Sequence, residues 1–138
     1  MVRVLMVDDD EDDREIFVSA LKSLNIQVQC HIARDGREAI EMLQSEILLA
    51  PDFIFLDLNM PRLSGMECLK ELQSIPGLKS IPVIIYTTSR NETDIEKSLA
   101  SGAAGFISKP TKFEELQRIL GTILRSSGTF SKKKIVFT

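Results

Sequence analysis

The chain has 138 residues, 43% hydrophobic side chains and a formal net charge of −3. This size and composition fit one domain with one core, and the weakly acidic balance argues against nucleic-acid binding through general basicity. The sequence has no N-terminal signal pattern and no uninterrupted apolar stretch of membrane-spanning length, so we expect a cytoplasmic protein without a membrane segment. Cys30 and Cys68 lack metal-type spacing and are expected to be buried, reduced thiols.

Short apolar runs alternate with helical patterns along most of the chain. Val2–Val7 is apolar and β-branched, which predicts a strand, and apolar residues at helical spacing from Ile16 to Leu24 predict the helix after it. The same alternation predicts strands at 28–32, 53–56, 81–86 and 105–108, and helices that begin near residues 36, 64, 91 and 111. The predicted fold is therefore α/β, with a doubly wound, five-stranded parallel sheet, flavodoxin-like, and helices on both faces.

Two of the predicted helices begin with a capping-box pattern. Ser64 and Glu67 have the Ser-x-x-Glu spacing of this motif, and Thr111 and Glu114 have the Thr-x-x-Glu spacing. In each pair, the hydroxyl and the carboxylate are expected to bind the free backbone N–H groups of the first helical turn.

The last residues differ from the rest of the chain. We expect a domain over residues 1–125 and an extension over 126–138, in which Ser126 to Gly128 act as a linker and Lys132 to Lys134 precede an apolar Ile135–Phe137. An apolar triplet after a linker can be covered in two ways. It packs on the domain, or it adds a strand to a neighbouring subunit in a homodimer.

Polar side chains follow most of the predicted strands. Asp8 and Asp9 come after the first strand, Asp57 after the third, Thr87 after the fourth and Lys109 after the fifth. The carboxyl ends of parallel strands meet at one edge of a sheet, where ligands bind, so these side chains are expected to converge. Clustered carboxylates raise the pKa of one another, so this edge is expected to bind a hard divalent cation, Mg²⁺ in particular.

The acidic block at residues 8–13 has a simpler explanation as well. Acidic residues in the first turn of a helix are stabilised by the helix dipole, which accounts for Asp10 to Asp13. Asp8 and Asp9 precede that turn, and with Asp57 and Lys109 at the same edge we favour the metal site for them. A cation, a lysine ammonium and a threonine hydroxyl suit phosphoryl oxygens, and Asp57 can itself be the nucleophile that forms an aspartyl phosphate.

These residues resemble the receiver domains of two-component response regulators, the CheY-like family. The resemblance covers Val2 to Arg125 and joins several separated motifs. They are the acidic pair Asp8-Asp9, D-L-N-M-P at 57–61, Ser64-Gly65-Met66, Thr87 after a hydrophobic strand, G-A-A-G-F at 102–106 and Lys109-Pro110.

The resemblance implies a metal set and an acceptor. Asp57 is implied as the phosphoacceptor, and Asp9 and Asp57 as carboxylate ligands of Mg²⁺ or Mn²⁺. Asn59 would add its backbone carbonyl, and Asp8 would act on the metal through water.

The resemblance also implies a site that binds the phosphoryl group and a pair of residues that act as a conformational switch. Lys109 and Thr87 would hold the phosphoryl group, with a backbone contact from Thr88, and the bond between Lys109 and Pro110 would be cis. Movement of Thr87 would let the ring of Phe106 turn inward and change the face made by the fourth helix, last strand and last helix. Because Phe106 stands where the family often has Tyr, a readout that needs a hydroxyl at this position is not expected.

The implied function is a stand-alone response regulator that receives its phosphoryl group from a sensor histidine kinase or a histidine phosphotransfer protein. Thr87 to Ser89 and the connection from Ile75 to Ser80 are similar to the small receivers that accompany bacterial phytochromes. One alternative is a phosphatase that turns over an aspartyl phosphate, but Asn59 stands where such enzymes place a second acid. The other is an interaction module of the same fold that is never phosphorylated.

Overall fold

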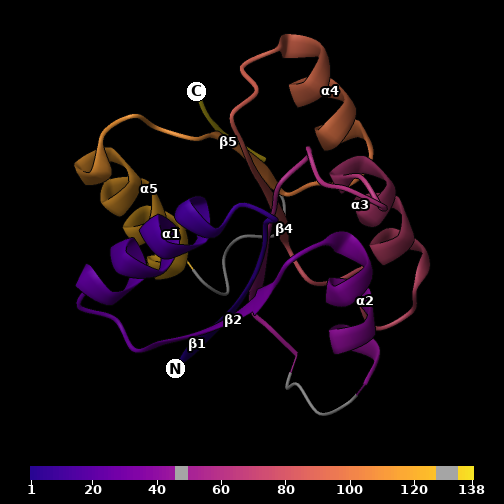
Figure 1. Ribbon diagram of the computed structural model, residues 1–138, viewed down its shortest axis with the longest axis horizontal. Helices are drawn as coiled ribbons and strands as arrows, with labels where there is room; N and C mark the ends of the chain where they lie inside the picture. The colour runs from indigo at the N-terminus through magenta and orange to yellow at the C-terminus, as the bar shows by residue number, and fades with distance from the viewer. Residues whose placement is uncertain (46–49, 127–133) are drawn as a thin grey trace.

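The computed structural model describes residues 1–45, 50–126 and 134–138. Within these residues a parallel sheet with the order β2-β1-β3-β4-β5-β6 runs through the middle of the molecule (Figure 1). Its strands are β1 (Val2–Val7), β2 (Val28–Ala33), β3 (Phe53–Leu56), β4 (Val83–Thr87), β5 (Gly105–Ser108) and β6 (Ile135–Phe137). The five strands predicted from the apolar runs are confirmed, and a sixth is added.

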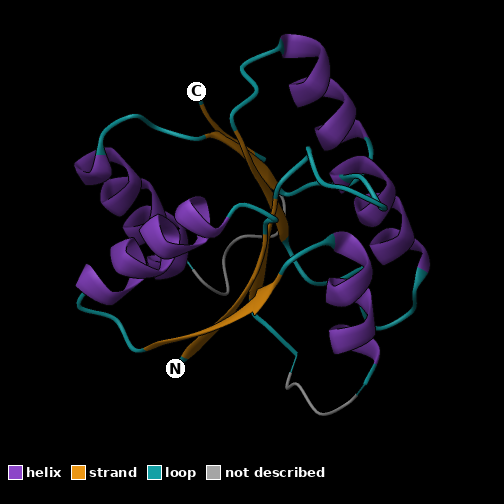
Figure 2. Ribbon diagram, in the orientation of Figure 1, coloured by secondary structure: helices purple, strands orange, loops and turns teal. Residues whose placement is uncertain are grey.

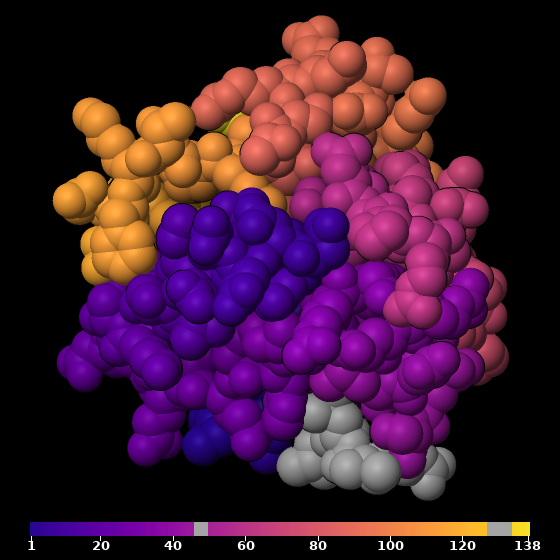
Figure 3. Space-filling model, in the orientation of Figure 1, coloured from indigo at the N-terminus to yellow at the C-terminus, as the bar shows by residue number. Residues whose placement is uncertain are grey.

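Helices cover both faces of the sheet (Figure 2). Helices α1 (Glu11–Ser23) and α5 (Phe113–Arg125) lie on one face, and α2 (Gly36–Gln44), α3 (Gly65–Ser74) and α4 (Glu92–Ala100) lie on the other. This arrangement confirms the doubly wound α/β fold. It also places every β-to-α connection at the same edge of the sheet. Figure 3 shows, from the same direction, the side chains that cover the sheet.

The core has two layers because the central strands are buried on both faces. In β1, Leu5 and Val7 pack toward α2 and α3, and Val4 and Met6 pack toward α1 and α5. All four residues of β3 are buried. A strand that is apolar on both faces has few ways to accommodate a charged residue, so the chain can become polar only where the strand ends.

The two predicted capping boxes had different outcomes. At α3 the Ser64 hydroxyl accepts from the Glu67 backbone N–H, and the Glu67 carboxylate accepts from the Ser64 N–H, so this prediction is confirmed. At α5 the prediction was wrong. The cap residue is Lys112, with no side-chain cap hydrogen bond, so the helix begins one residue later than a Thr111 cap would allow.

Strand β6 extends the sheet beyond β5. It runs parallel to β5, and a Cβ on Gly105 would lie 2.9 Å from the Ile135 carbonyl oxygen, so the close approach depends on this glycine. Ile135 and Phe137 pack against the α1–α5 side of the core, and the Lys134 ammonium donates to the Leu99 carbonyl at the end of α4. The apolar triplet therefore packs on its own domain. The predicted linker from residue 127 on, with Lys132 and Lys133, lies outside the described residues.

Two smaller expectations can also be compared with the structure. Cys30 and Cys68 are free thiols, and burial raises the pKa of both to about 12. Across the described ranges, none of the helices has the length and apolar character needed to cross a membrane.

Candidate functional site

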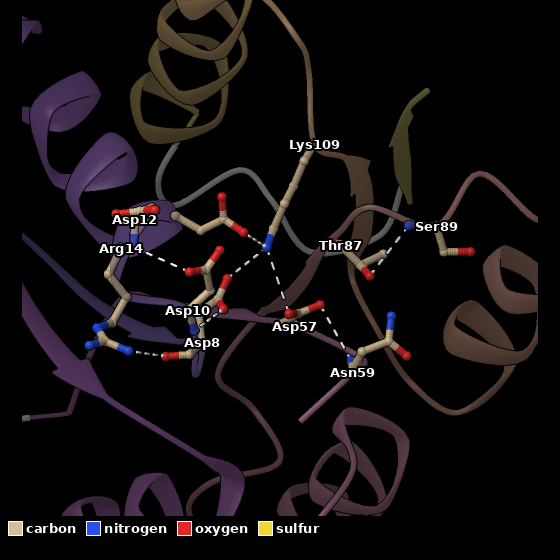
Figure 4. Close-up of polar contacts among 10 residues, drawn as sticks. Asp8, Asp10, Asp12, Arg14, Asp57, Asn59, Thr87, Ser89 and Lys109 are labelled. Carbon is tan, nitrogen blue, oxygen red and sulfur yellow. Dashed lines mark hydrogen bonds and ion pairs between the residues drawn. The ribbon is translucent and has the colours of Figure 1, made fainter. Parts of the chain in front are cut away.

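The carboxyl ends of four strands meet at one edge of the sheet, and their side chains face one another there (Figure 4). Backbone hydrogen bonds continue the sheet into this edge, because the Asp57 N–H donates to the Val7 oxygen at 3.0 Å and the Lys109 N–H donates to the Thr87 oxygen at 2.7 Å. Strand geometry therefore fixes where these residues lie. The structure brings together the residues that the sequence predicted to converge.

Three carboxylates form the centre of the edge. Oxygen atoms of Asp8, Asp9 and Asp57 all lie within 4.8 Å of one another. Asp8 is fully buried, Asp57 is 7% exposed and Asp9 is exposed to solvent. Three hard oxygen donors at this separation, open to water on one side, fit a divalent cation that keeps part of its hydration shell.

The next residue of the implied metal set lies at the rim of the site. Asn59 is exposed, and its backbone N–H donates to Asp57 Oδ1 at 3.4 Å. This bond holds the turn after β3 against the Asp57 carboxylate.

The Lys109 ammonium is a positive charge that lies among these carboxylates. Its Nζ lies 2.8 Å from Asp8 Oδ2 and 2.7 Å from Asp13 Oδ2. Asp57 Oδ2 is farther away, at 3.6 Å. The lysine side chain is 9% exposed, so these carboxylates replace most of its water.

Asp13 was not among the predicted site residues. Its carboxylate was expected to interact with the helix dipole, together with those of Asp10 and Asp12. One signal could have singled it out, because Asp13 stands four residues before the buried Phe17 and so shares the inward face of α1.

Burial and charge act on Asp57 in opposite directions. Burial raises the pKa of Asp57 and the Asp8 carboxylate adds to the increase, while Lys109 and the Thr87 hydroxyl lower it. The net shift of the Asp57 pKa is upward, so its ionised form is less favourable in the folded protein than in water. Burial would lower the pKa of Lys109, but hydrogen bonds to Asp13 and Asp8 outweigh it and the pKa is raised, which keeps the ammonium charged.

Thr87 and its neighbours form the far side of the edge. Thr87 is fully buried, and its hydroxyl oxygen accepts from the Ser89 backbone N–H at 3.5 Å. The Ser108 hydroxyl donates to the Ser89 carbonyl at 2.8 Å, which ties this loop to β5. Thr88 is exposed, whereas Phe106 is fully buried on the side of the sheet that α2, α3 and α4 cover. The ring of Phe106 is therefore already inside the core.

Gly65 was not predicted to have a structural role, but the packing at the start of α3 requires a glycine at this position. A Cβ at this position would lie 2.1 Å from the Asp57 carbonyl oxygen, closer than any side chain tolerates. The Gly65 N–H donates to the Leu58 carbonyl at 2.9 Å. Only glycine lets the start of α3 pack directly against the backbone of Asp57 and Leu58.

One residue-level expectation was wrong. The described residues contain no cis peptide bond, so Lys109 and Pro110 are joined in the trans form. The trans form of an X–Pro bond is favoured by about 0.5–1 kcal/mol unless its surroundings require cis. The Lys109 ammonium reaches Asp8 and Asp13 from a trans bond.

Comparison with known proteins decides the family. Residues 4–121 match the response regulator receiver domain. The chain belongs to this family. It is a phosphorylation-based signalling protein, and as a receiver domain it binds a divalent metal and takes its phosphoryl group from a donor such as a histidine kinase.

Two individual response regulators are similar to this chain over most of its length. Response regulator Rcp1 of Synechocystis is 34% identical over 121 residues, which span 85% of this chain and 82% of Rcp1. The Mn²⁺-bound structure of Rcp1 has a TM-score of 0.80 and 32% identity, covering 94% of this chain and 95% of that one. The phosphorylated cyanobacterial phytochrome response regulator RcpA has a TM-score of 0.84 and 31% identity, covering 95% and 96%.

Proposed function

We propose that Asp57 is the residue that accepts the phosphoryl group. The observation that carries this proposal is the freedom of its carboxylate within the buried cluster. Both oxygens of Asp8 are occupied, by the Asp10 N–H at 3.0 Å and by Lys109 at 2.8 Å, whereas the Asn59 N–H and the Lys109 ammonium lie farther from the Asp57 oxygens, at 3.4 and 3.6 Å. Asp57 therefore keeps a lone pair for attack on phosphorus, and an ammonium beside it for the incoming charge.

The transfer exchanges one bond to phosphorus for another. A carboxylate oxygen of Asp57 forms a bond to phosphorus as the bond from phosphorus to the donor's histidine nitrogen breaks, and the electron pair leaves with that nitrogen. The product is an aspartyl phosphate. Lys109 and Thr87 are proposed to bind the phosphoryl oxygens, together with the backbone of Thr88, so catalysis is mostly positioning and neutralisation of charge.

Mg²⁺ is the proposed metal, with Mn²⁺ as a substitute. Asp9, Asp57 and the carbonyl of Asn59 would bind it, and Asp8 would act through a bound water. The metal supplies positive charge for the phosphoryl oxygens, which the single ammonium of Lys109 cannot balance alone. Mn²⁺ is bound in the structure of Rcp1, which supports a divalent ion of this size.

The proposed signal starts at Thr87. Thr87 pairs in register with Ser108, and Phe106 pairs with Ile85, so both switch residues lie on the β4–β5 pair. When the Thr87 hydroxyl turns to a phosphoryl oxygen, it leaves the Ser89 N–H, and the β4–α4 loop and the packing around Phe106 adjust. The α4–β5–α5 face then presents a changed surface to the downstream partner.

The donor is proposed to be a sensor histidine kinase of the phytochrome type, or a histidine phosphotransfer protein. The phytochrome response regulator RcpA among the similar structures supports the first choice. Ile16 and Phe113 are 46% and 39% exposed and line one shallow hollow. This hollow lies at the start of α1 and α5, next to the site, and suits contact with an apolar face of the donor.

Intact-mass measurement after incubation with acetyl phosphate and Mg²⁺ tests the proposed function. A persistent phosphoryl adduct that is absent in Asp57→Asn supports the receiver mechanism. Rapid phosphate release without an adduct would identify a phosphatase instead, and no reaction at all would identify an interaction module.

A further inference from the structure

The contact between Asp13 and Lys109 has no place in the mechanism so far. Asp13 lies in the first turn of α1, and its carboxylate is 28% exposed. At 2.7 Å it is the shortest of the three ion pairs that Lys109 makes in the described part of the chain. A charge-assisted hydrogen bond to a largely buried ammonium is among the stronger polar interactions in a protein.

The Lys109 ammonium is shared between the carboxylates of Asp8 and Asp13. An ammonium has three N–H donors, and in Lys109 two of them are used at hydrogen-bond distance, by Asp8 and Asp13. The third carboxylate, Asp57, is left 3.6 Å away, beyond an ordinary N–H···O bond. Figure 4 shows the Lys109 ammonium between the acids of α1 and Asp57.

We propose that Asp13 is a positioning residue that holds the Lys109 ammonium close to Asp57 but off its carboxylate, so that the nucleophile stays free until the phosphoryl group arrives. This inference rests on the proposed role of Asp57. Without Asp13, Asp8 alone would hold the ammonium, and the strongest remaining attraction would be toward Asp57. A direct ion pair would then occupy the lone pair that must attack phosphorus.

The surroundings of Asp13 are consistent with a specific pairing. Its other neighbour is Asp10, and a hydrogen bond between the two carboxyl groups is the first cause of the raised pKa of Asp10. Asp12, the intervening acid, makes no ion pair with Lys109. Asp12 is thus a matched control for the loss of an acid from the same helical turn.

The kinetic test measures the rate of phosphorylation by acetyl phosphate, followed by intact mass, in a double-mutant cycle of Asp13→Ala and Lys109→Met. Loss of one charge-assisted hydrogen bond corresponds to a change of roughly tenfold, so we expect Asp13→Ala to slow phosphorylation about tenfold and Asp12→Ala to leave it unchanged. In the Lys109→Met background Asp13→Ala should have no further effect. Asp13→Glu, which keeps the charge, should restore part of the rate.

Equal slowing with and without Lys109 would overturn the proposal, because Asp13 would then act through the fold or the metal. An unchanged rate in Asp13→Ala would overturn it as well. Mg²⁺ affinity, measured by calorimetry, should stay within about twofold of the wild type, since Asp13 is outside the proposed metal set.

A second measurement needs no phosphorylation and so separates this inference from the proposed function. The Lys109 ammonium protons, detected by NMR on ¹⁵N-lysine protein, should exchange slowly with water in the wild type and in Asp12→Ala. In Asp13→Ala they should exchange at least about tenfold faster, because one protecting hydrogen bond is gone. Unchanged exchange in Asp13→Ala would contradict the positioning role even if Asp57 proved to be the acceptor.

Discussion

The carboxyl edge of the sheet is rich in charged side chains, whereas its β5–β6 side consists of paired backbone and apolar side chains. At the carboxyl edge, Asp8, Asp13 and Asp57 lie around the Lys109 ammonium and Asp9 lies next to Asp8 and Asp57, so negative charge is in excess in a partly buried place. The β5–β6 side has backbone pairing and apolar side chains that need no ligand. We propose that the first region binds a cation and a phosphoryl group at a cost in stability, and that the second contributes stability without touching the site. Some mutations should therefore change phosphorylation without changing stability, and others should change stability without changing phosphorylation.

The largest effect is expected from Asp9→Asn. Asp9 is exposed and belongs to the carboxylate cluster, so the substitution should remove a metal ligand without disturbing the core. Phosphorylation by acetyl phosphate at 1 mM Mg²⁺ should fall about 100-fold or more, while the thermal midpoint stays within about 2 °C. Glu11→Gln is the control for loss of an exposed charge nearby. Wild-type phosphorylation in Asp9→Asn would remove this residue from the metal site.

The β5–β6 side should show the reverse pattern. The double substitution Ile135→Ser and Phe137→Ser removes half-buried apolar surface and should lower the free energy of unfolding by about 2 kcal/mol, measured by urea denaturation. Phosphorylation should remain within about twofold of the wild type. Val136→Ser is the matched control, because Val136 is 42% exposed and should change stability little. Impaired phosphorylation in the double variant at a temperature where it is folded would contradict the separation of the two regions.

The burial of the Asp57 carboxylate predicts a gain in stability from Asp57→Asn. Burial is the first cause of the raised pKa of Asp57, so the ionised form is less favourable in the folded protein. The contribution of such a carboxyl to stability is present below its unfolded pKa and is lost as the pH rises through its folded pKa. Without metal at pH 7, Asp57→Asn should therefore unfold at higher urea, with a gain of about 1 kcal/mol.

Two further results would sharpen this prediction. Near pH 3 the stabilities of the wild type and Asp57→Asn should converge. Adding Mg²⁺ should stabilise the wild type more than the variant, because a ligand stabilises the state that binds it. A metal-free wild type that is more stable than Asp57→Asn at pH 7 would show that Lys109 already balances the charge.

The smallest effect concerns the helix caps, which lie outside the contrast between the two regions. Ser64→Ala should cost about 1 kcal/mol because both capping-box hydrogen bonds are formed at α3. Thr111→Ala should change the free energy of unfolding by less than about 0.5 kcal/mol, because α5 begins at a different cap residue. Equal costs, measured by urea denaturation, would show that the two caps are alike in solution.

The fold and the central site residues could be predicted because one pattern encodes both. Each buried strand is an apolar run, and the first polar residue after it must lie at the carboxyl edge. Asp8, Asp57 and Lys109 were located in this way, and the periodic helices between them required a parallel sheet.

Other features depend on contacts between segments that are far apart in the sequence. Asp13 is one of several acidic residues in the same helical turn, and only its place on the inward face of α1 brings it to Lys109. The sequence does not say which sheet edge a triplet such as Ile135–Phe137 will join. Gly65 stands in a recognisable motif, but its distance from the Asp57 carbonyl follows from the packing of α3.

The central claim is that the phosphoryl group is carried by Asp57, and chemical trapping tests it most directly. Sodium borohydride reduces an acyl phosphate of aspartate to homoserine, which peptide mass spectrometry can locate after incubation with acetyl phosphate and Mg²⁺. We predict homoserine at position 57 only, and none when Mg²⁺ is replaced by a chelator. Homoserine at position 8 or 9, or its absence from a protein that carries the phosphoryl mass, would contradict this account.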